Sequence, residues 1–257
     1  MGFTTTLSTH GSEEGIAEIV MDVPPVNALT VSQWFELADV ILAAGADPTV
    51  GAVVLRAEGR GFNAGVDIKE MQNTKGFEAL IGANRGCYAA FAAVYDCEVP
   101  VIAAVHGYCL GGGIGLVGNA DIIVAAEGTR FGLPEVNQGA LGGATHFARL
   151  VPPHQLRQAV YTAEPLDASV LERWGSVTRV VPADELRAAA MEIAAKICTK
   201  SRFVIRRAKE SLNAIDPIDV KRSYRMEQGF TYELNLSGVS DEARDAFVDK
   251  TDAKFTK

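Results

Sequence analysis

Cysteine is scarce in this sequence of 257 residues, and its few copies form no pattern that would build a site. No two of them lie at C-x-x-C spacing, and each has apolar neighbours: Cys87, Cys97, Cys109 and Cys198. This pattern favours buried free thiols over disulfide bonds or a metal site. The sequence shows no other cluster of metal ligands, so we expect a protein without a metal centre.

Long apolar runs are also missing, although hydrophobic residues make up 48% of the chain. No run reaches the roughly 18 residues that a helix needs to cross a bilayer. The first ten residues, MGFTTTLSTH, have neither a basic start nor an apolar stretch, so they do not resemble a secretion signal. We therefore expect a soluble, cytoplasmic protein.

Positive charge is in deficit. The chain has 24 Lys and Arg against 32 Asp and Glu, which gives a formal net charge of −8. Such a balance argues against a nucleic acid or an anionic membrane as the main partner. It leaves room for a small anionic ligand where basic residues gather locally.

What the sequence does contain is a recurring order of apolar strand, glycine-rich loop and amphipathic helix. Apolar, β-branched runs predict strands over residues 15–21, 50–56, 99–105 and 121–125. Apolar residues at helical spacing predict helices over 34–42 and 77–95. The uneven spacing of these units predicts an α/β fold built as a spiral of β-β-α units.

The pattern changes to successive amphipathic helices near residue 185. These helices are predicted over 185–200, 202–213, 218–236 and 240–249, with interruptions at Pro217 and Gly238. We interpret residues 1–184 as the core domain and residues 185–257 as a helical region for trimerisation or for a lid.

Glycine is concentrated after the strand predicted over 99–105. Gly107 opens a turn, and five more glycines follow at positions 111, 112, 113, 115 and 118, where an apolar helix begins. Glycine permits positive φ and lets the backbone approach a ligand closely. The N–H groups of residues 111–113 would be unpaired at a helix start, which predicts an anion or oxyanion site.

A second glycine loop, Gly61–Asp67, follows a strand of similar type. If the two strands are neighbours, N–H groups of both loops can converge on one oxygen, each worth roughly 3 kcal/mol in acyl chemistry. For any single glycine, close packing of a helix is the simpler explanation. Two glycine loops after strands of similar type favour a functional site. Residues 113–118 also match G-x-G-x-x-G, so an NAD-binding oxidoreductase is a minor alternative, with Glu135 near the spacing of its acidic partner.

Taken together, these stretches resemble the crotonase, or enoyl-CoA hydratase/isomerase, superfamily. The resemblance is carried by NALT (27–30), FNAGVDIKE (62–70), HGYCLGGGIGL (106–116) and DIIVAAEGTRFGLPEV (121–136). It implies a β-β-α spiral core, a helical C-terminal region and assembly as a homotrimer or a hexamer. It also implies an acyl-CoA substrate, with coenzyme A as part of the substrate and no separate cofactor.

The same resemblance implies roles for individual residues. The thioester oxygen would accept hydrogen bonds from the backbone N–H groups of Val66 and Gly112. The loop of Val66, Asp67, Ile68 and Lys69 would line the coenzyme A. Near the C-terminus, Phe247 and Lys250 could reach the coenzyme A of a neighbouring subunit, although one face of an amphipathic helix is the simpler interpretation of these two.

Hydratases of this superfamily carry two glutamates, one three residues after the oxyanion glycine and one in a Pro-Glu motif. Here the first position is Gly115 and only Glu135 remains. Adding water to a double bond uses one group to orient or deprotonate the water and another to handle the second proton. The loss of a carboxylate at position 115 therefore argues against hydratase activity. Glu135 would be the general base, with a raised pKa if it is buried. His146 could face the same pocket or be structural, and His106 is expected to fix the turn at Gly107.

One branch of the superfamily is most similar, comprising hydrolases of steroid breakdown that open a ring of a bicyclic oxo-acyl-CoA. The similar stretches are GFNAGVDIKEMQ, ANRGCYAAFAAVY, GGGIGLVGNADIIVA, FGLPEV, GALGGATHFARLVP and YRMEQGFTYELNL. This branch implies a retro-Claisen cleavage in which Glu135 activates water and Gly115 leaves room for the bicyclic acyl group. An enoyl-CoA hydratase or isomerase, and an inactive acyl-CoA-binding paralogue, are the alternatives.

Overall fold

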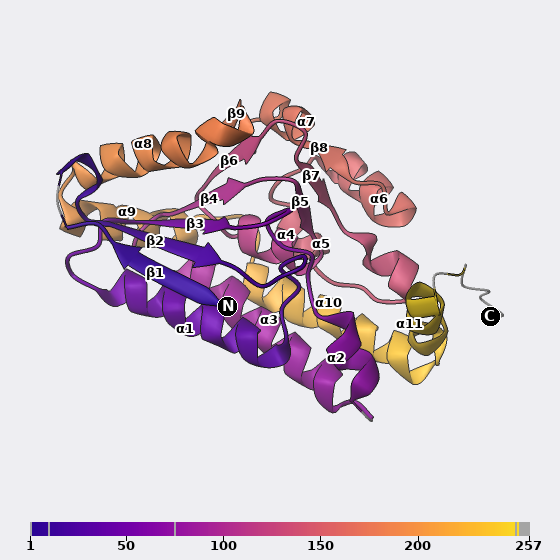
Figure 1. Cartoon of the computed structure of the whole chain (residues 1–257). Coiled ribbons are helices and arrows are strands. Elements are labelled where there is room, and N and C mark those ends of the chain that lie inside the picture. Colours follow the sequence, from indigo (N-terminus) through magenta and orange to yellow (C-terminus); the bar gives the residue numbers. More distant parts are fainter. Residues whose placement is uncertain (1, 10, 75, 250, 252–257) are drawn as a thin grey trace.

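Two sheets, with helices on both faces of the larger one, make up the computed structural model, which describes residues 2–9, 11–74, 76–249 and 251 (Figure 1). The larger sheet has the strand order β1-β2-β3-β4-β6-β9. Its strands are β1 Phe3–Leu7, β2 Ile16–Met21, β3 Ala52–Ala57, β4 Val101–Val105, β6 Ile122–Ala126 and β9 Arg179–Val181. All neighbouring pairs are parallel except β1 with β2.

A smaller sheet has the strand order β5-β7-β8 and lies at the end of the larger one. Its strands are β5 Tyr108–Leu110, β7 Arg130–Gly132 and β8 Leu166–Asp167. The chain runs from β4 into β5 and then into helix α4 Gly112–Val117. It runs likewise from β6 into β7 and then into the 3-10 helix η2 Pro134–Gln138. The predicted α/β spiral of β-β-α units is therefore confirmed.

The strands of the larger sheet divide their side chains between two cores. In β4, Val101, Ala103 and Val105 pack on the side of α1 and α3, whereas Ile102 and Ala104 pack on the side of α8. All five residues of β4 are buried. Because both faces of a parallel sheet are covered, its strands appear in the sequence as continuous apolar runs, and this is why β2, β3, β4 and β6 could be predicted.

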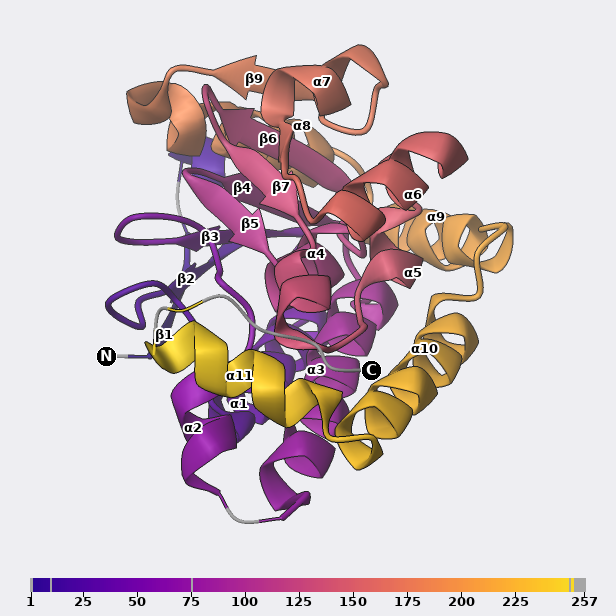
Figure 2. The same cartoon turned by 90° about the vertical axis from the view of Figure 1, so that its right-hand side faces the viewer.

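The helices lie in two groups. The first group precedes β9: α1 Val31–Ala46, α2 Ile68–Asn73, α3 Glu78–Asp96, α5 Ala144–Phe147, α6 Pro153–Thr162 and α7 Ala168–Arg173. The second group follows β9: α8 Leu186–Cys198, α9 Arg202–Ala214, α10 Val220–Leu236 and α11 Val239–Asp249. Helix α8 covers one face of the larger sheet, and α11 crosses beside α2 and α10 (Figure 2).

Helix α1 begins at Val31, earlier than the periodicity indicated, because a capping box sets its start. The Thr30 side chain accepts from Gln33 N, and Gln33 Oε1 accepts from Thr30 N at 3.0 Å. Glu70 on α2 adds a further cap, since its Oε2 accepts from Val31 N at 2.7 Å. The glycine loop that precedes α2 is thereby tied to the start of α1.

No helix within the described ranges combines the length and the apolar character needed to span a membrane.

Candidate active site

Backbone hydrogen bonds hold the two glycine loops side by side. Phe62 N donates to Tyr108 O at 2.8 Å, and Leu110 N donates to Asn63 O at 2.9 Å. These bonds continue the pairing of neighbouring strands β3 and β4 beyond the end of the larger sheet. The expectation that the two loops follow adjacent strands is confirmed.

The turn at Gly65 also brings the two loops close together. Gly65 has φ +90°, and a methyl group added there would lie 3.2 Å from Gly112 N. The buried Asn63 side chain holds this turn: its Oδ1 accepts from Gly65 N at 2.8 Å, and its Nδ2 donates to Asn27 O at 2.6 Å. Glycine is required at position 65 both for the positive φ and for the close approach.

Two backbone N–H groups at this junction have no acceptor. Val66 N and Gly112 N make no hydrogen bond with any described residue. Gly112 is the first residue of α4, so its N–H has no intrahelical partner. Trp34 lies behind it, because a methyl group added at Gly112 would come within 2.7 Å of the indole ring. The two N–H groups are free to bind a ligand oxygen.

Glu135 lies beside this pair of loops. Gly111 N donates to Gly132 O at 3.1 Å, which joins the second glycine loop to β7 and so to η2. A methyl group added at Gly111 would lie 3.0 Å from Glu135 Oε1. The Oε2 atom is shielded from solvent and has no hydrogen-bond partner within the described chain. Burial, with a smaller contribution from the charge of Glu227, raises the pKa of Glu135 to about 8.

The segment after Glu135 is held in place by α10 and α11. Glu227 on α10 accepts from Ala144 N at 2.9 Å and from Thr145 N at 3.1 Å. Thr231, one turn further along, bonds both the N–H and the C=O of Leu141. Ser240 on α11 donates to Gly139 O. The C-terminal helices therefore determine the backbone path of the loop that follows Glu135.

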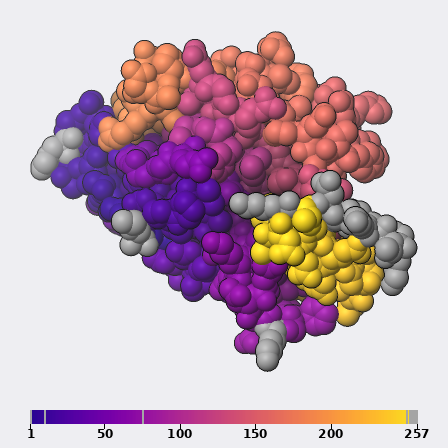
Figure 3. All heavy atoms as spheres, turned by 45° about the vertical axis from the view of Figure 1, so that its right-hand side comes forward, coloured from indigo at the N-terminus to yellow at the C-terminus, as the bar shows by residue number. Residues whose placement is uncertain are grey.

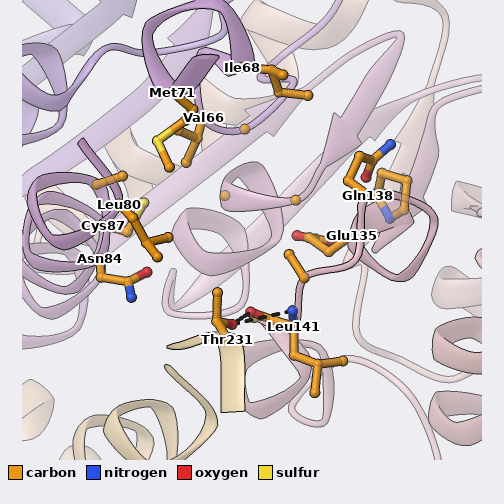
Figure 4. Close-up of a pocket in the computed structure, with 18 of the residues that line it drawn as sticks. Val66, Ile68, Met71, Leu80, Asn84, Cys87, Glu135, Gln138, Leu141 and Thr231 are labelled. Atoms are coloured by element: carbon orange, nitrogen blue, oxygen red, sulfur yellow. Dashed lines mark hydrogen bonds between the residues drawn. The ribbon is translucent and has the colours of Figure 1, made fainter. Parts of the chain in front are cut away.

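These elements enclose a cavity of about 420 Å³. Helix α3 contributes Leu80, Asn84, Cys87 and Phe91 to its wall, and α10 contributes Tyr224, Thr231 and Asn235. The α11 helix supplies Arg244 and Phe247. Figure 4 shows Asn84 and Glu135 entering the cavity from opposite sides. Figure 3 shows α11 against the segment that contains α2 and α3. The wall is mostly apolar, which suits an acyl group with few polar atoms.

Comparison with known proteins identifies the family. Residues 11–257 match the family described as Enoyl-CoA hydratase/isomerase. This chain belongs to the enoyl-CoA hydratase/isomerase family. It is 62% identical over 249 residues to the (7aS)-7a-methyl-1,5-dioxo-2,3,5,6,7,7a-hexahydro-1H-indene-carboxyl-CoA hydrolase of Rhodococcus jostii (strain RHA1), covering 97% of this chain and 95% of that protein.

Two further comparisons agree with this family assignment. The hydrolase of the same name from Mycobacterium tuberculosis (strain ATCC 25618 / H37Rv) is 62% identical over 239 residues, which cover 93% of this chain and 97% of that protein. The crystal structure of an enoyl-CoA hydratase from Mycobacterium avium subsp. paratuberculosis K-10 superposes with a TM-score of 0.86 at 26% identity. That match covers 100% of this chain and 99% of the other chain.

The structure brings together some of the residues that the resemblance to this family selected. Five of them line the cavity: Val66, Ile68, Gly112, Glu135 and Phe247. Asp67 instead caps α2, with its Oδ1 accepting from Lys69 N at 2.9 Å, and Lys69 is exposed. Phe247 contributes to the cavity of its own chain. Lys250 lies outside the described residues.

The expectation that Gly115 leaves room for the acyl group is wrong. A methyl group built on Gly115 would lie 2.2 Å from Cζ of Phe91, so the phenyl ring of Phe91 already occupies that volume. Gly115 is buried in α4 and does not line the cavity.

Replacing Gly115 with alanine should therefore destabilise the fold by overpacking. We expect a loss of about 1–3 kcal/mol in the free energy of unfolding, measured by urea denaturation. Gly229→Ala is the matched control, because this helical glycine has open space around it and the change should stabilise α10 by up to about 1 kcal/mol. Equal stability of Gly115→Ala and the wild-type protein would contradict the packing of Phe91 against α4.

His146 is part of the wall behind the cavity. Its ring lies 5.0 Å from the Phe91 ring and 4.7 Å from the Tyr224 ring, centroid to centroid, and does not reach the cavity surface. Asn119 Nδ2 donates to His146 Nδ1 at 2.9 Å, and burial lowers the pKa of His146 to about 3. His106 Nε2 donates to Gly59 O at 3.0 Å and so connects the turn at Gly107 to the preceding loop.

Reasoning from sequence missed most of the cavity wall. Asn84 and Phe91 face the cavity from α3, and Tyr224 and Arg244 face it from α10 and α11. Their helices were predicted, and the polar Asn84 at helical spacing from the apolar Leu80 and Cys87 was a visible signal. The faces that these helices turn toward Glu135 depend on contacts between segments far apart in the chain.

Proposed function

We propose that this protein hydrolyses a carbon–carbon bond in the ring of a bicyclic oxo-acyl-CoA in steroid catabolism. The observation that carries the proposal is one buried carboxylate, that of Glu135, beside two unpaired backbone N–H groups in a largely apolar cavity. Cleavage of this kind requires a base for the attacking water and hydrogen-bond donors for the thioester oxygen. The 62% identity to hydrolases of a dioxo-hexahydro-indene-carboxyl-CoA supports this choice of substrate class.

In the proposed reaction, Glu135 removes a proton from water while the water oxygen adds to a ring ketone. The bond between the former ketone carbon and its ring neighbour then breaks. Its electron pair moves through the conjugated system to the thioester oxygen, where the N–H groups of Val66 and Gly112 stabilise the enolate. The proton held by Glu135 passes to the ring carbon, and the former ketone becomes a carboxylic acid.

Binding roles follow from the same proposal. Val66 and Ile68 line the cavity, and with Asp67 and Lys69 on the same loop they would contact the coenzyme A portion of the substrate, with no other cofactor needed.

We further propose a cytoplasmic homotrimer or hexamer. Large apolar side chains exposed on α9 and α10 support assembly, among them Phe203, Leu212, Met226 and Leu236.

The test is product analysis with two substrates. Purified protein is given the bicyclic dioxo-indene-carboxyl-CoA and, separately, a short enoyl-CoA, and the products are analysed by NMR. We expect a new carboxylate and the loss of one ring ketone from the first substrate. An intact bicycle together with a 3-hydroxyacyl product from the enoyl-CoA would instead identify the protein as a hydratase.

The pH dependence of the reaction should report the buried carboxylate. Glu135 must be ionised to accept a proton, and burial raises its pKa to about 8. We therefore expect kcat/KM to increase about tenfold per pH unit on the acidic side and to level off above about pH 8. The measurement is kcat/KM from about pH 6 to 9.5, and a flat profile over that range would contradict the role of Glu135 as base.

A further inference from the structure

Four buried side-chain atoms have no hydrogen-bond partner among the described residues: Trp34 Nε1, Asn84 Nδ2, Glu135 Oε2 and His146 Nε2. Only Asn84 and Glu135 of this set line the cavity. Asn84 offers a donor and Glu135 an acceptor, and the two side chains enter the cavity from opposite sides (Figure 4). An unpaired buried polar atom costs about 1–3 kcal/mol, so a matched donor and acceptor at one cavity point to a ligand that satisfies both.

The proposed reaction develops negative charge on two oxygens that are far apart in the substrate. The thioester oxygen receives charge when the carbon–carbon bond breaks, and Val66 and Gly112 would bind it. The oxygen of the attacked ring ketone receives charge earlier, when water adds. A donor is therefore needed at a second position in the cavity, and the two backbone N–H groups are already engaged at the first.

Two other polar side chains on the cavity wall, Thr231 and Arg244, are already paired. Thr231 bonds both backbone groups of Leu141. Arg244 donates to Asn235 Oδ1 at 2.9 Å and forms an ion pair with Asp241. The carboxamide of Asn84 thus offers a donor that no described acceptor engages.

The backbone of Asn84 is also held in place. It lies within α3, and its backbone oxygen accepts from Gln228 Nε2 at 2.7 Å. Gln228 Oε1 in turn accepts from Arg225 Nη1 at 2.9 Å. Leu80 and Cys87, one helical turn to either side, place the carboxamide in apolar surroundings, where a hydrogen bond to a developing anion is strong.

We propose that Asn84 Nδ2 donates the hydrogen bond that stabilises the oxygen of the ring ketone as water adds to it. This inference rests on the proposed function. The water oxygen forms a bond to the ketone carbon, Glu135 takes one proton, and the ketone π electrons move onto the oxygen that Asn84 holds. When the ring bond breaks, that oxygen becomes part of the new carboxylic acid, so Asn84 binds both the intermediate and the product.

The experiment compares Asn84→Leu, which keeps the branched shape of the side chain but removes the donor, with the wild-type protein. We expect kcat on the dioxo-indene-carboxyl-CoA to decrease by about 10²–10³-fold, as for the loss of one oxyanion donor, with KM changed only a few-fold. An analogue with a methylene group in place of the attacked ketone should inhibit both proteins with the same inhibition constant. Arg85→Ala, at an exposed position of α3, should behave like the wild-type protein.

Three results would overturn the inference, each in a recognisable way. Unchanged kcat of Asn84→Leu would remove Asn84 from the reaction while leaving the proposed function intact. Weaker binding of the methylene analogue, in proportion to the loss of kcat, would show that Asn84 only shapes the cavity. Failure of the wild-type protein to open the ring would reject the proposed function and this inference together.

Discussion

Replacing Glu135 with glutamine is expected to lower kcat on the ring substrate by about 10²–10⁴-fold, the usual contribution of a general base. Glutamine keeps the shape of the side chain but cannot accept a proton from water. The unpaired Oε2 atom and the raised pKa of about 8 support the proposal that this carboxylate is the base of the site. Steady-state kinetics at about pH 8 provide the measurement.

The same variant supplies its own folding control. The folded pKa of Glu135 lies above the ordinary value of 4.5, so the folded state binds this proton more tightly than the unfolded state does. Stability from this group is present at low pH and is lost as pH rises from about 4.5 to about 8. Glutamine does not ionise, so Glu135→Gln should melt at or above the wild-type temperature at about pH 9. Undiminished turnover in such a stable variant would falsify the role of Glu135.

Replacing Gly65 with alanine is expected to abolish most activity through the backbone. The methyl group would meet Gly112 N at 3.2 Å, and φ +90° is unfavourable for alanine. Any relief of this contact separates Val66 from Gly112, so the two N–H groups no longer bind the same oxygen. We expect kcat to decrease by about 10²–10³-fold and the free energy of unfolding by about 1–3 kcal/mol.

Gly59→Ala separates these two effects. Gly59 has nearly the same backbone conformation, φ +84°, but an added methyl group would meet nothing within 4 Å. This control should lose similar stability and keep its activity, as measured by thermal melting and steady-state kinetics. Equal activities of the two variants would show that the junction of the glycine loops is not the site of thioester activation.

The long elements of this fold could be predicted because each has its own signal. Strands β2, β3, β4 and β6 are continuous apolar runs, and helices α1, α3 and α8 to α11 show clear helical spacing. Strand β1, with three threonines between Phe3 and Leu7, and helix α6 were not predicted. The short strands β5, β7, β8 and β9 were missed as well. Each has two or three residues and forms through pairing with a strand elsewhere in the chain. A pattern that short carries no periodicity of its own.

Some site residues could likewise be placed from the sequence, and others could not. Val66, Gly112 and Glu135 lie in loops whose glycines and motif mark them in the sequence, and the structure places all three on one cavity. Gly115 shows the opposite case. A missing side chain at one position does not leave a space, because Phe91, from another helix, fills it.

The sequence by itself determined the backbone features of this protein: glycine where positive φ and close approach are needed, and one glutamate after a proline. These are local properties, set by the conformational limits of single residues. Only the tertiary structure decided the shape of the cavity, the shielding of Glu135 and the unpaired state of Asn84 Nδ2. Volume, desolvation and hydrogen-bond pairing depend on every neighbour in space, and here those neighbours come from segments as far apart as Val66 and Phe247.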